Sequence, residues 1–251
     1  MSTETTVLAL RLQGPMQSWG HSSQFNRRDT ALFPTKSALV GLCCAAMGFD
    51  RGSEEEKTAL LKFAETKLVC FAIPCKQKKR EVAVKRMQDY HTVQNTRDAK
   101  GSIKNDAVLT YRQYLNDACF IALLEGEKEF LGCVTASLQN PVWGVWLGRK
   151  SCIPSAPVFA GVFSSESEAI INISEFEGKT VDNFSHAREV TSFGNGIDSY
   201  MDQAVSFDIH GRQFAPRRVM LQEAKASAPP NPSAAASCSS SRFEKGNSKN
   251  A

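Results

Sequence analysis

The sequence of 251 residues predicts an α+β fold, and three features of its apolar pattern support that class. Continuous apolar runs of strand length recur through the first half, segments with helical spacing alternate with them, and shorter strand-like pieces separated by Gly, Pro and Ser follow residue 141. A chain of this length buries enough apolar surface to fold without disulfides, so its eight cysteines are expected to be reduced and mostly buried.

The first elements expected are one strand and two helices. Residues 6–12, TVLALRL, form an apolar run that predicts a buried strand, and the Gly-Pro pair that follows cannot continue a ladder. Apolar residues at helical offsets predict a helix over 35–47, which a glycine ends. A capping box formed by Ser53 and Glu56 predicts a second helix, over about 53–65.

The middle of the chain predicts three strands, a hairpin and a short helix. Residues 67–73 form an apolar run stopped by proline, and 80–87 alternate in polarity, so both are expected to be strands. The segment 89–111 is polar, basic and poor in core residues, which suits a projecting hairpin. Residues 118–124 have the apolar run of a central strand, and 130–138 fit a short helix.

After residue 141 the pattern shortens. Four strand-like pieces, at 142–147, 157–163, 205–211 and 217–221, suggest a small β-rich lobe. The last residues are mostly Ser, Ala, Pro and Asn, a composition that cannot repay the entropy of ordering. The expected organisation is a first domain at 1–140 with an arm at about 80–115, a small lobe at 141–223, and a disordered tail or linker at 224–251.

The motif GPMQSWG places three candidate binding residues after the first strand. A strand that breaks at a sheet edge there would offer the polar groups of Gln17 and Ser18 and the ring of Trp19 to an unpaired base. The alternative is a turn with a core tryptophan.

A second candidate site lies where the 35–47 helix begins. Free backbone N–H groups, the hydroxyls of Thr35 and Ser37 and the ammonium of Lys36 would converge there on a phosphate. Thr35 alone is equally explained as an ordinary N-cap, but Arg27 and Arg28 in the preceding loop favour an anion site.

The arm and a later turn supply further basic residues. Between residues 76 and 104, nine Lys or Arg stand against three Asp or Glu. Such charge interleaved with aromatic rings is typical of RNA-binding surfaces, although a charge run alone usually marks a solvated hairpin. A basic turn after a predicted strand, in WLGRKSC, is a weak signal by itself. The candidate residues are Tyr90, His91, Thr92 and Arg112 in the arm and Arg149, Lys150 and Ser151 in the turn.

Taken in order, GPMQSWG, FPTKSALVGL, DYHTV, YRQYLNDACF, WLGRKSC and RQFAPR resemble the CasD family of type I-E CRISPR Cascade complexes, from residue 6 to about 222. The resemblance implies a ferredoxin-like, RNA-recognition-type domain with a projecting thumb, followed by a small β-rich lobe. It implies a non-catalytic, cytoplasmic subunit that holds the 5′ handle of the CRISPR RNA and caps the complex backbone in antiviral defence. The implied partners are the backbone subunit CasC, the large subunit CasA and, through the complex, target DNA; no cofactor, metal or membrane contact is expected.

The resemblance also implies which part of the RNA-binding surface each candidate residue would belong to. Gln17, Ser18, Trp19, Arg28, Thr35, Lys36 and Ser37 would line the handle site, Tyr90, His91 and Thr92 would lie at the base of the thumb, and Arg149, Lys150 and Ser151 would close the groove.

The alternative function is a metal-free endoribonuclease, because relatives in another CRISPR subtype cut repeat RNA. Lys85, Tyr90 and His91 would then supply the acid and base. The non-catalytic role is preferred for two reasons. His91 is the only histidine in the arm, and in the subtype that the sequence resembles a separate subunit, CasE, cuts the RNA.

Overall fold

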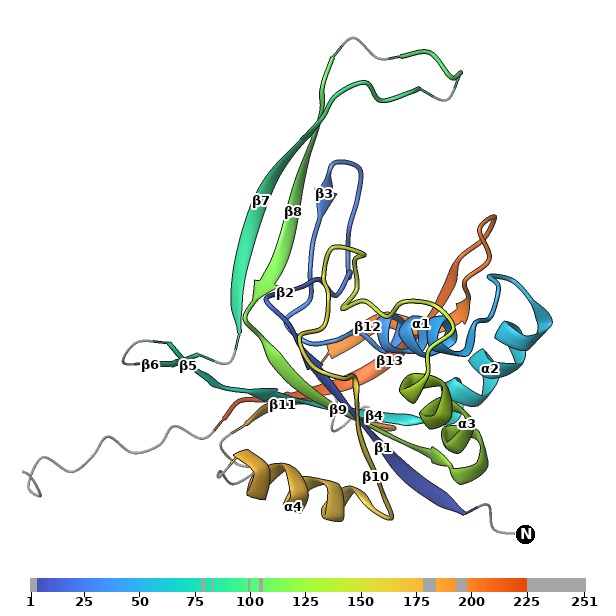
Figure 1. The fold of residues 1–251 in the computed structure, drawn as a ribbon, viewed down its shortest axis with the longest axis vertical. Helices are drawn as coiled ribbons and strands as arrows, with labels where there is room; N and C mark the ends of the chain where they lie inside the picture. Colours follow the sequence, from blue (N-terminus) through green and yellow to red (C-terminus); the bar gives the residue numbers. More distant parts are fainter. Residues whose placement is uncertain are drawn as a thin grey trace, which may run out of the picture.

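The computed structural model describes residues 4–77, 80–82, 84–98, 100–103, 106–177, 184–192 and 198–224, and the predicted tail lies outside them apart from Ala224. A seven-stranded sheet, antiparallel throughout, forms the centre of the molecule (Figure 1). Its strands, in spatial order, are β10 (Phe159–Phe163), β1 (Thr5–Gln13), β9 (Cys119–Glu127), β4 (Lys67–Ile73), β11 (Ser185–Glu189), β13 (Gln213–Gln222) and β12 (Asp198–Ser206).

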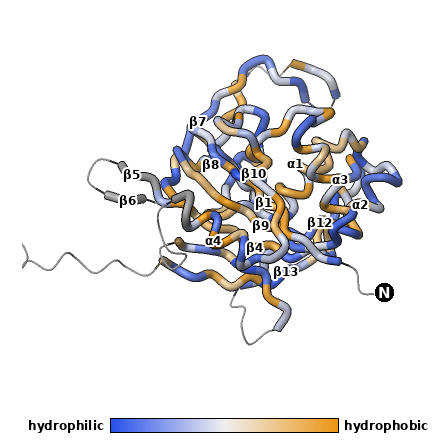
Figure 2. Tube along the Cα trace, turned by 60° about the horizontal axis from the view of Figure 1, so that its bottom comes forward, coloured by the Kyte–Doolittle hydropathy of each residue, from blue (hydrophilic) through white to orange (hydrophobic). Residues whose placement is uncertain are grey.

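Strands β1, β9 and β4 bury both of their faces, which explains their continuous apolar runs. In β1, Leu8 and Leu10 belong to one core cluster, whereas Val7 and Ala9 belong to another on the opposite face. Successive side chains alternate between the faces of a sheet, so a strand covered on both sides requires apolar residues at every position. Figure 2 shows hydrophobic residues along β1 and β9. The structure confirms the strands predicted at 6–12, 67–73 and 118–124.

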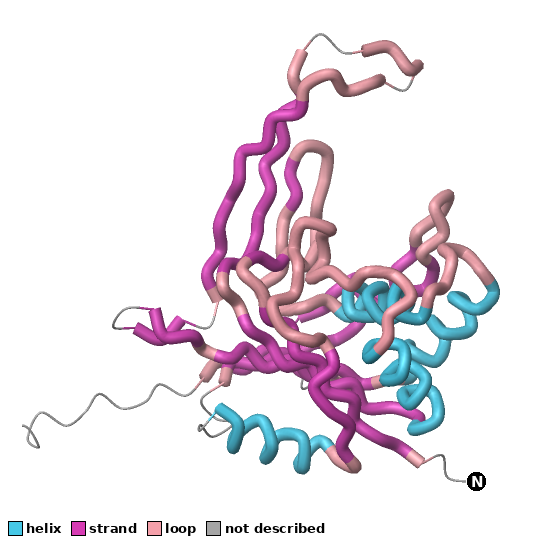
Figure 3. Tube along the Cα trace, viewed as in Figure 1, coloured by secondary structure: helices cyan, strands magenta, loops and turns pink. Residues whose placement is uncertain are grey.

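Helices cover both faces of this sheet (Figures 1 and 3). On one face lie α1 (Lys36–Met47), α2 (Glu54–Glu65) and α3 (Lys128–Gln139), and on the other lies α4 (Glu166–Glu177). The helices predicted at 35–47, 53–65 and 130–138 are confirmed. Half of the predicted capping box is present, since Glu56 N donates to Ser53 Oγ at 3.2 Å, whereas the Glu56 carboxylate accepts from Gly52 N and not from the N-cap N–H of Ser53.

A second sheet carries a long hairpin that extends away from the central sheet (Figure 1). Strands β7 (Lys85–Val93) and β8 (Val108–Asn116) pair antiparallel, as the sequence predicted for an arm. Two short strands, β2 (Met16–Gln17) and β3 (Arg27–Arg28), pair with β8. The strand predicted at 80–87 is divided between β6 (Arg80–Val82) and the start of β7, and β6 pairs with β5 (Cys75–Gln77).

Several predictions beyond residue 141 are corrected by the structure. Residues 142–147, expected to form a strand, belong to a loop without regular structure (Figure 3). Of the strand expected at 205–211, only the first two residues belong to a strand, as the end of β12, which finishes at Ser206. Residues 207–211 lie in the turn that follows. Neither α4 nor β11 was expected. Strand β11 joins β4 to β13, so strands from both sides of residue 140 share one sheet, and the proposed division into two units stays a prediction.

Six cysteines, Cys43, Cys44, Cys70, Cys119, Cys133 and Cys152, are free thiols, and all of them except Cys133 are buried. Burial raises the pKa of Cys44 and of Cys70 to about 12, and that of Cys43 further, so their reactive thiolate form is scarce at neutral pH. Alkylation of the folded protein should therefore modify the exposed Cys133 and spare Cys70, as measured by mass spectrometry of peptides. Modification of Cys70 as fast as Cys133 would contradict the buried placement.

Candidate functional site

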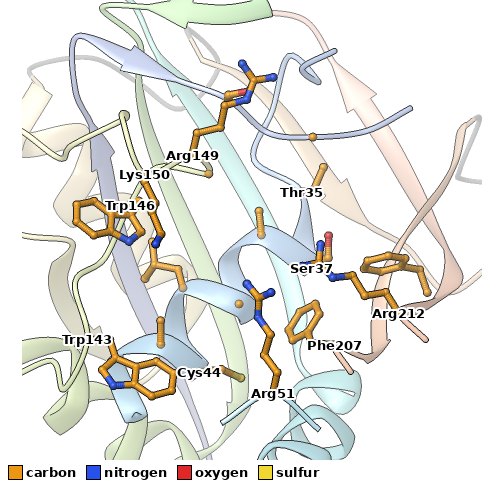
Figure 4. Close-up of a pocket in the computed structure, with 18 of the residues that line it drawn as sticks. Thr35, Ser37, Cys44, Arg51, Trp143, Trp146, Arg149, Lys150, Phe207 and Arg212 are labelled. Atoms are coloured by element: carbon orange, nitrogen blue, oxygen red, sulfur yellow. The ribbon is translucent and has the colours of Figure 1, made fainter. Parts of the chain in front are cut away.

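A cavity of about 680 Å³ lies between α1, the loop that follows α3, and the β12–β13 hairpin; we call it the α1 cavity (Figure 4). In Figure 4, Trp143 and Trp146 lie on one side of α1, and Phe207 and Arg212 lie on the other. The residues that line the cavity include Ser18, Arg28, Thr35, Ser37, Gly41, Arg51, Trp143, Trp146, Arg149, Lys150, Phe207, Arg212 and Phe214.

The loop that follows α3 is fixed at two points. Trp143 N donates to Ala45 O at 3.2 Å, where the carbonyl groups at the end of α1 lack partners within the helix. Farther along, Ser18 N donates to Leu147 O at 3.0 Å. These bonds hold the loop against both α1 and the segment after β1, so the cavity is formed by the fold before any ligand arrives.

The α1 cavity is positively charged. Its one acidic lining residue, Glu56, is 2% exposed, and Glu56 Oε2 already accepts from Gly52 N at 2.7 Å. An anion that enters the cavity therefore meets an excess of positive charge. The basic lining residues are Arg28, Arg51, Arg149, Lys150 and Arg212.

The start of α1 brings two predicted site residues, Thr35 and Ser37, to this cavity. Thr35 is the N-cap but makes no side-chain capping bond, and within the described part of the chain Thr35 Oγ1 is buried without a hydrogen-bond partner. Asp202 Oδ2 accepts from Lys36 N at 2.8 Å. The first N–H of the helix is thus occupied by a carboxylate from β12, while Ser37 remains at the cavity wall.

Lys36, expected to contact a phosphate, is instead buried inside the protein. Its side chain is fully inaccessible, and Lys36 Nζ donates to Thr66 O at 2.5 Å and to Glu189 Oε2 at 3.1 Å. Burial is the main cause that lowers the pKa of Lys36, although Glu189 opposes this shift. Arg217 and Asp202, whose Nη2 and Oδ2 lie 2.7 Å apart, complete a group of four charges in which Lys36, Arg217 and Asp202 are buried and Glu189 is 18% exposed. This ammonium has no surface through which to reach RNA.

Gln17 and Trp19 are also internal, so the alternative of a turn with a core tryptophan describes this motif. Trp19 Nε1 donates to Gln17 Oε1 at 3.1 Å, and neither residue is exposed. Gln17 Nε2 donates to Leu12 O at 2.9 Å and to Ala118 O at 2.6 Å, which ties β1 to the start of β9. Ser18 is 2% exposed at the wall of the cavity.

Arg149 connects the cavity to the hairpin. Its guanidinium carbon lies 4.6 Å from the centroid of the Tyr114 ring, and its Nη atoms donate to Gln113 O at 3.2 Å and to Arg28 O at 3.0 Å. Arg149 therefore holds β3 and β8 beside the cavity. Lys150 and Ser151, by contrast, are exposed.

The remaining predicted residues lie along the hairpin, outside the α1 cavity. The ring of Tyr90, 54% exposed, faces that of Tyr111 across the strands with centroids 5.3 Å apart, and the guanidinium of Arg27 lies 5.8 Å from Tyr111. His91 and Thr92 are exposed, and Arg112 is partly buried. The register places Tyr90, Thr92 and Tyr111 on one face of the hairpin, with Arg27 against Tyr111, and His91 and Arg112 on the opposite face.

Sequence reasoning missed half of the cavity. Trp143 and Trp146 were assigned to a strand, although their spacing of three residues fits no alternating strand. The other missed residues are Arg51, in the turn between two predicted helices, and Phe207, Arg212 and Phe214, on a hairpin whose place beside α1 no local pattern encodes.

The described residues contain no group of three or more His, Cys, Asp or Glu side chains that could hold a metal ion. None of the helices described is both long and apolar enough to cross a membrane.

Comparisons with known proteins agree with the motifs. Residues 7–220 match the family model described as CRISPR-associated protein (Cas_Cas5). Over 176 residues the chain is 34% identical to the CRISPR system Cascade subunit CasD of Escherichia coli (strain K12), a match that covers 66% of this chain and 76% of that protein.

Solved structures agree with the fold. A chain of a CRISPR RNA-guided surveillance complex superposes with a TM-score of 0.67 at 23% identity, covering 86% of this chain and 89% of that one. The crystal structure of a Cas protein gives a TM-score of 0.57 at 26% identity, covering 87% and 94%. The resemblance stated from the motifs is confirmed: CasD is a relative of this chain, and the chain belongs to the Cas_Cas5 family of CRISPR-associated proteins.

Proposed function

We propose that this chain is a non-catalytic RNA-binding subunit of a type I CRISPR Cascade surveillance complex, in which it holds the 5′ handle of the CRISPR RNA. The observation that carries the proposal is the α1 cavity, where basic and aromatic side chains meet at the base of the β7–β8 hairpin. Proteins that bind single-stranded RNA place cationic side chains near its phosphates and stack aromatic side chains on its bases, and this site presents both kinds of side chain. The family membership of the chain supports the same role.

In this proposal the fold divides its tasks. Strands β1, β4, β9 and β10 with α1 to α3 form a ferredoxin-like core. The β7–β8 hairpin is the thumb that packs over the guide beside the backbone subunit CasC. The large subunit CasA and, through the complex, target DNA are the other partners. RNA would contact Arg28, Ser37 and Lys150 in the cavity, Arg27 on β3, and Tyr90 and Arg112 on the hairpin.

Binding of the purified chain to single-stranded RNA of the host's own repeat should weaken strongly as salt rises, because phosphate contacts release counterions. Lys150→Ala should reduce the slope of log K against log salt by about 0.7, the value for one phosphate contact on a single strand. Lys57→Ala is the control, because Lys57 is exposed on α2 and pairs with Glu54. Affinity that does not change with salt would refute the proposed role.

The proposed role also predicts that His91→Ala leaves repeat RNA processing unchanged. His91 is exposed on a two-stranded hairpin, where water screens the charges that would stabilise a transition state. The test incubates labelled repeat RNA with the wild-type chain, without metal and without CasE. Specific cleavage that disappears in His91→Ala would instead establish the endoribonuclease.

A further inference from the structure

The turn at residues 24–27, between β2 and β3, exposes a phenylalanine to solvent. Phe25 is 89% exposed, a higher value than that of any other large apolar residue in the part of the chain that the structure describes. In Figure 1 the loop that carries this turn rises beside the β7–β8 hairpin. Single exposed apolar residues are common on protein surfaces, so exposure alone does not assign a role to Phe25.

Phe25 also adopts a backbone conformation that phenylalanine disfavours. Its φ is 47°, and the other non-glycine residues with positive φ in the described part of the chain are Asn95 and Asp117. Asn and Asp tolerate this region because their short side chains bond to nearby backbone, which phenylalanine cannot do. Arg27 N donates to Gln24 O at 2.9 Å, so Phe25 is the first central residue of a two-residue turn. Glycine is favoured there when φ is positive, and the chain instead keeps a strained, exposed ring.

Hydrogen bonds fix this turn to the rest of the protein. Tyr111 N, on β8, donates to Asn26 O at 2.8 Å, next to Phe25 in the sequence. Lower in the loop, Asp29 N donates to Ser23 Oγ at 3.0 Å. The ring of Phe25 is therefore presented on a backbone that is ordered before any partner arrives, and little backbone entropy is lost when the ring is covered.

The residues next to Phe25 are polar and carry few charges. Residues 20–26, GHSSQFN, contain no Asp, Glu, Lys or Arg. Of the two arginines that follow, Arg27 lies against the ring of Tyr111, and Arg28 lines the α1 cavity, which Phe25 does not line. A ring that stacks on RNA is normally accompanied by cations for the adjacent phosphates. The tip of this turn instead fits an apolar pocket with an uncharged rim.

We propose that Phe25 anchors a neighbouring protein subunit: its ring enters an apolar pocket with an uncharged, hydrogen-bonding rim on the backbone subunit that packs beside the β7–β8 hairpin. This inference rests on the proposed function, which supplies that neighbour, and it goes beyond it by assigning a contact with protein and not with RNA. Aromatic rings buried at interfaces contribute much of the binding free energy of many complexes. Glycine would relax the turn but would remove this contact, which explains why the strained ring is kept.

The test titrates the full chain against backbone subunits assembled on CRISPR RNA, and measures its stability separately. Phe25→Gly should weaken binding to the backbone subunits by about 30-fold or more, the effect of truncating an interface hot spot. The same variant, purified alone, should unfold at a temperature about 2–4 °C higher than the wild type, because glycine relieves the positive φ. Its affinity for repeat RNA in the absence of other subunits should equal that of the wild type.

Phe25→Leu distinguishes a protein pocket from an RNA base. Leucine fills an apolar pocket but cannot stack on a planar base, so this variant should retain most of the affinity for the backbone subunits. Leu61→Ala is the matched control, because Leu61 is also a highly exposed apolar residue, at 73%, and lies on α2. It should change neither assembly nor RNA binding.

Three outcomes would overturn the anchor and leave the proposed function standing. The first is full assembly of Phe25→Gly with the backbone subunits. The second is a lower unfolding temperature for Phe25→Gly, which would show that the ring packs on its own protein. The third is an equal loss of RNA affinity in Phe25→Gly and Phe25→Leu, which would indicate base stacking. Failure of the wild-type chain to bind either repeat RNA or the backbone subunits would instead refute the proposed function itself.

Discussion

Lys36→Ala is expected to lower the free energy of unfolding by about 3–5 kcal/mol, the cost of removing one partner from a buried ion pair. Lys36 is fully buried and bonds to Glu189 and to Thr66 O. Without the ammonium, the carboxylates of Glu189 and Asp202 share only the charge of Arg217, in a place that water reaches poorly. Urea unfolding followed by circular dichroism measures the change as a lower midpoint at constant slope.

The control for this prediction is Lys57→Ala on α2. Lys57 also forms an ion pair, with Glu54 at 2.7 Å, but its side chain is 51% exposed. Exposed pairs contribute little to stability because solvent screens them, so this variant should unfold almost like the wild type. Equal midpoints for Lys36→Ala and the wild type would show that Lys36 is not buried and would restore it as a candidate phosphate ligand.

Elements with a strong local period could be predicted from the sequence. The α1 helix was found because Leu39, Leu42 and Cys43 share one face, and the same residues pack into the core. The α4 helix was missed although Ser165 and Glu168 give a capping signal, and Glu168 N does donate to Ser165 Oγ at 3.2 Å. Strand β11 was missed because its sequence has no apolar run. It is a strand because it pairs with β4 on one side and with β13 on the other, and no local pattern shows that pairing.

The part of the candidate site that comes from short local motifs was predictable from the sequence. Arg28, Ser37 and Lys150 were identified from local motifs and do line the cavity. The burial of Lys36 was not predictable, because it depends on Glu189, which is 153 residues away along the chain. Local motifs identify groups that can bind an anion, but tertiary pairing decides whether those groups are used inside the protein instead.

Gly148→Ala should disrupt the α1 cavity and reduce RNA binding together with stability. Gly148 has φ of 94°, and a Cβ atom there would lie 1.8 Å from Ser18 O. The contact is with backbone, so no side-chain rotation can relieve it, and the turn that carries Lys150 must move. The left-handed backbone and the overpacking together cost roughly 2–5 kcal/mol.

The matched control is Gly132→Ala in α3, where a Cβ atom would meet no heavy atom within 4 Å. Alanine favours the helix, so this variant should gain about 0.5–1 kcal/mol and bind RNA as the wild type does. Thermal unfolding and RNA titration of both variants separate the two effects. If Gly148→Ala retained both stability and affinity, the turn would not be docked on Ser18, and the cavity would lose the wall that places Lys150 and Trp146 beside α1.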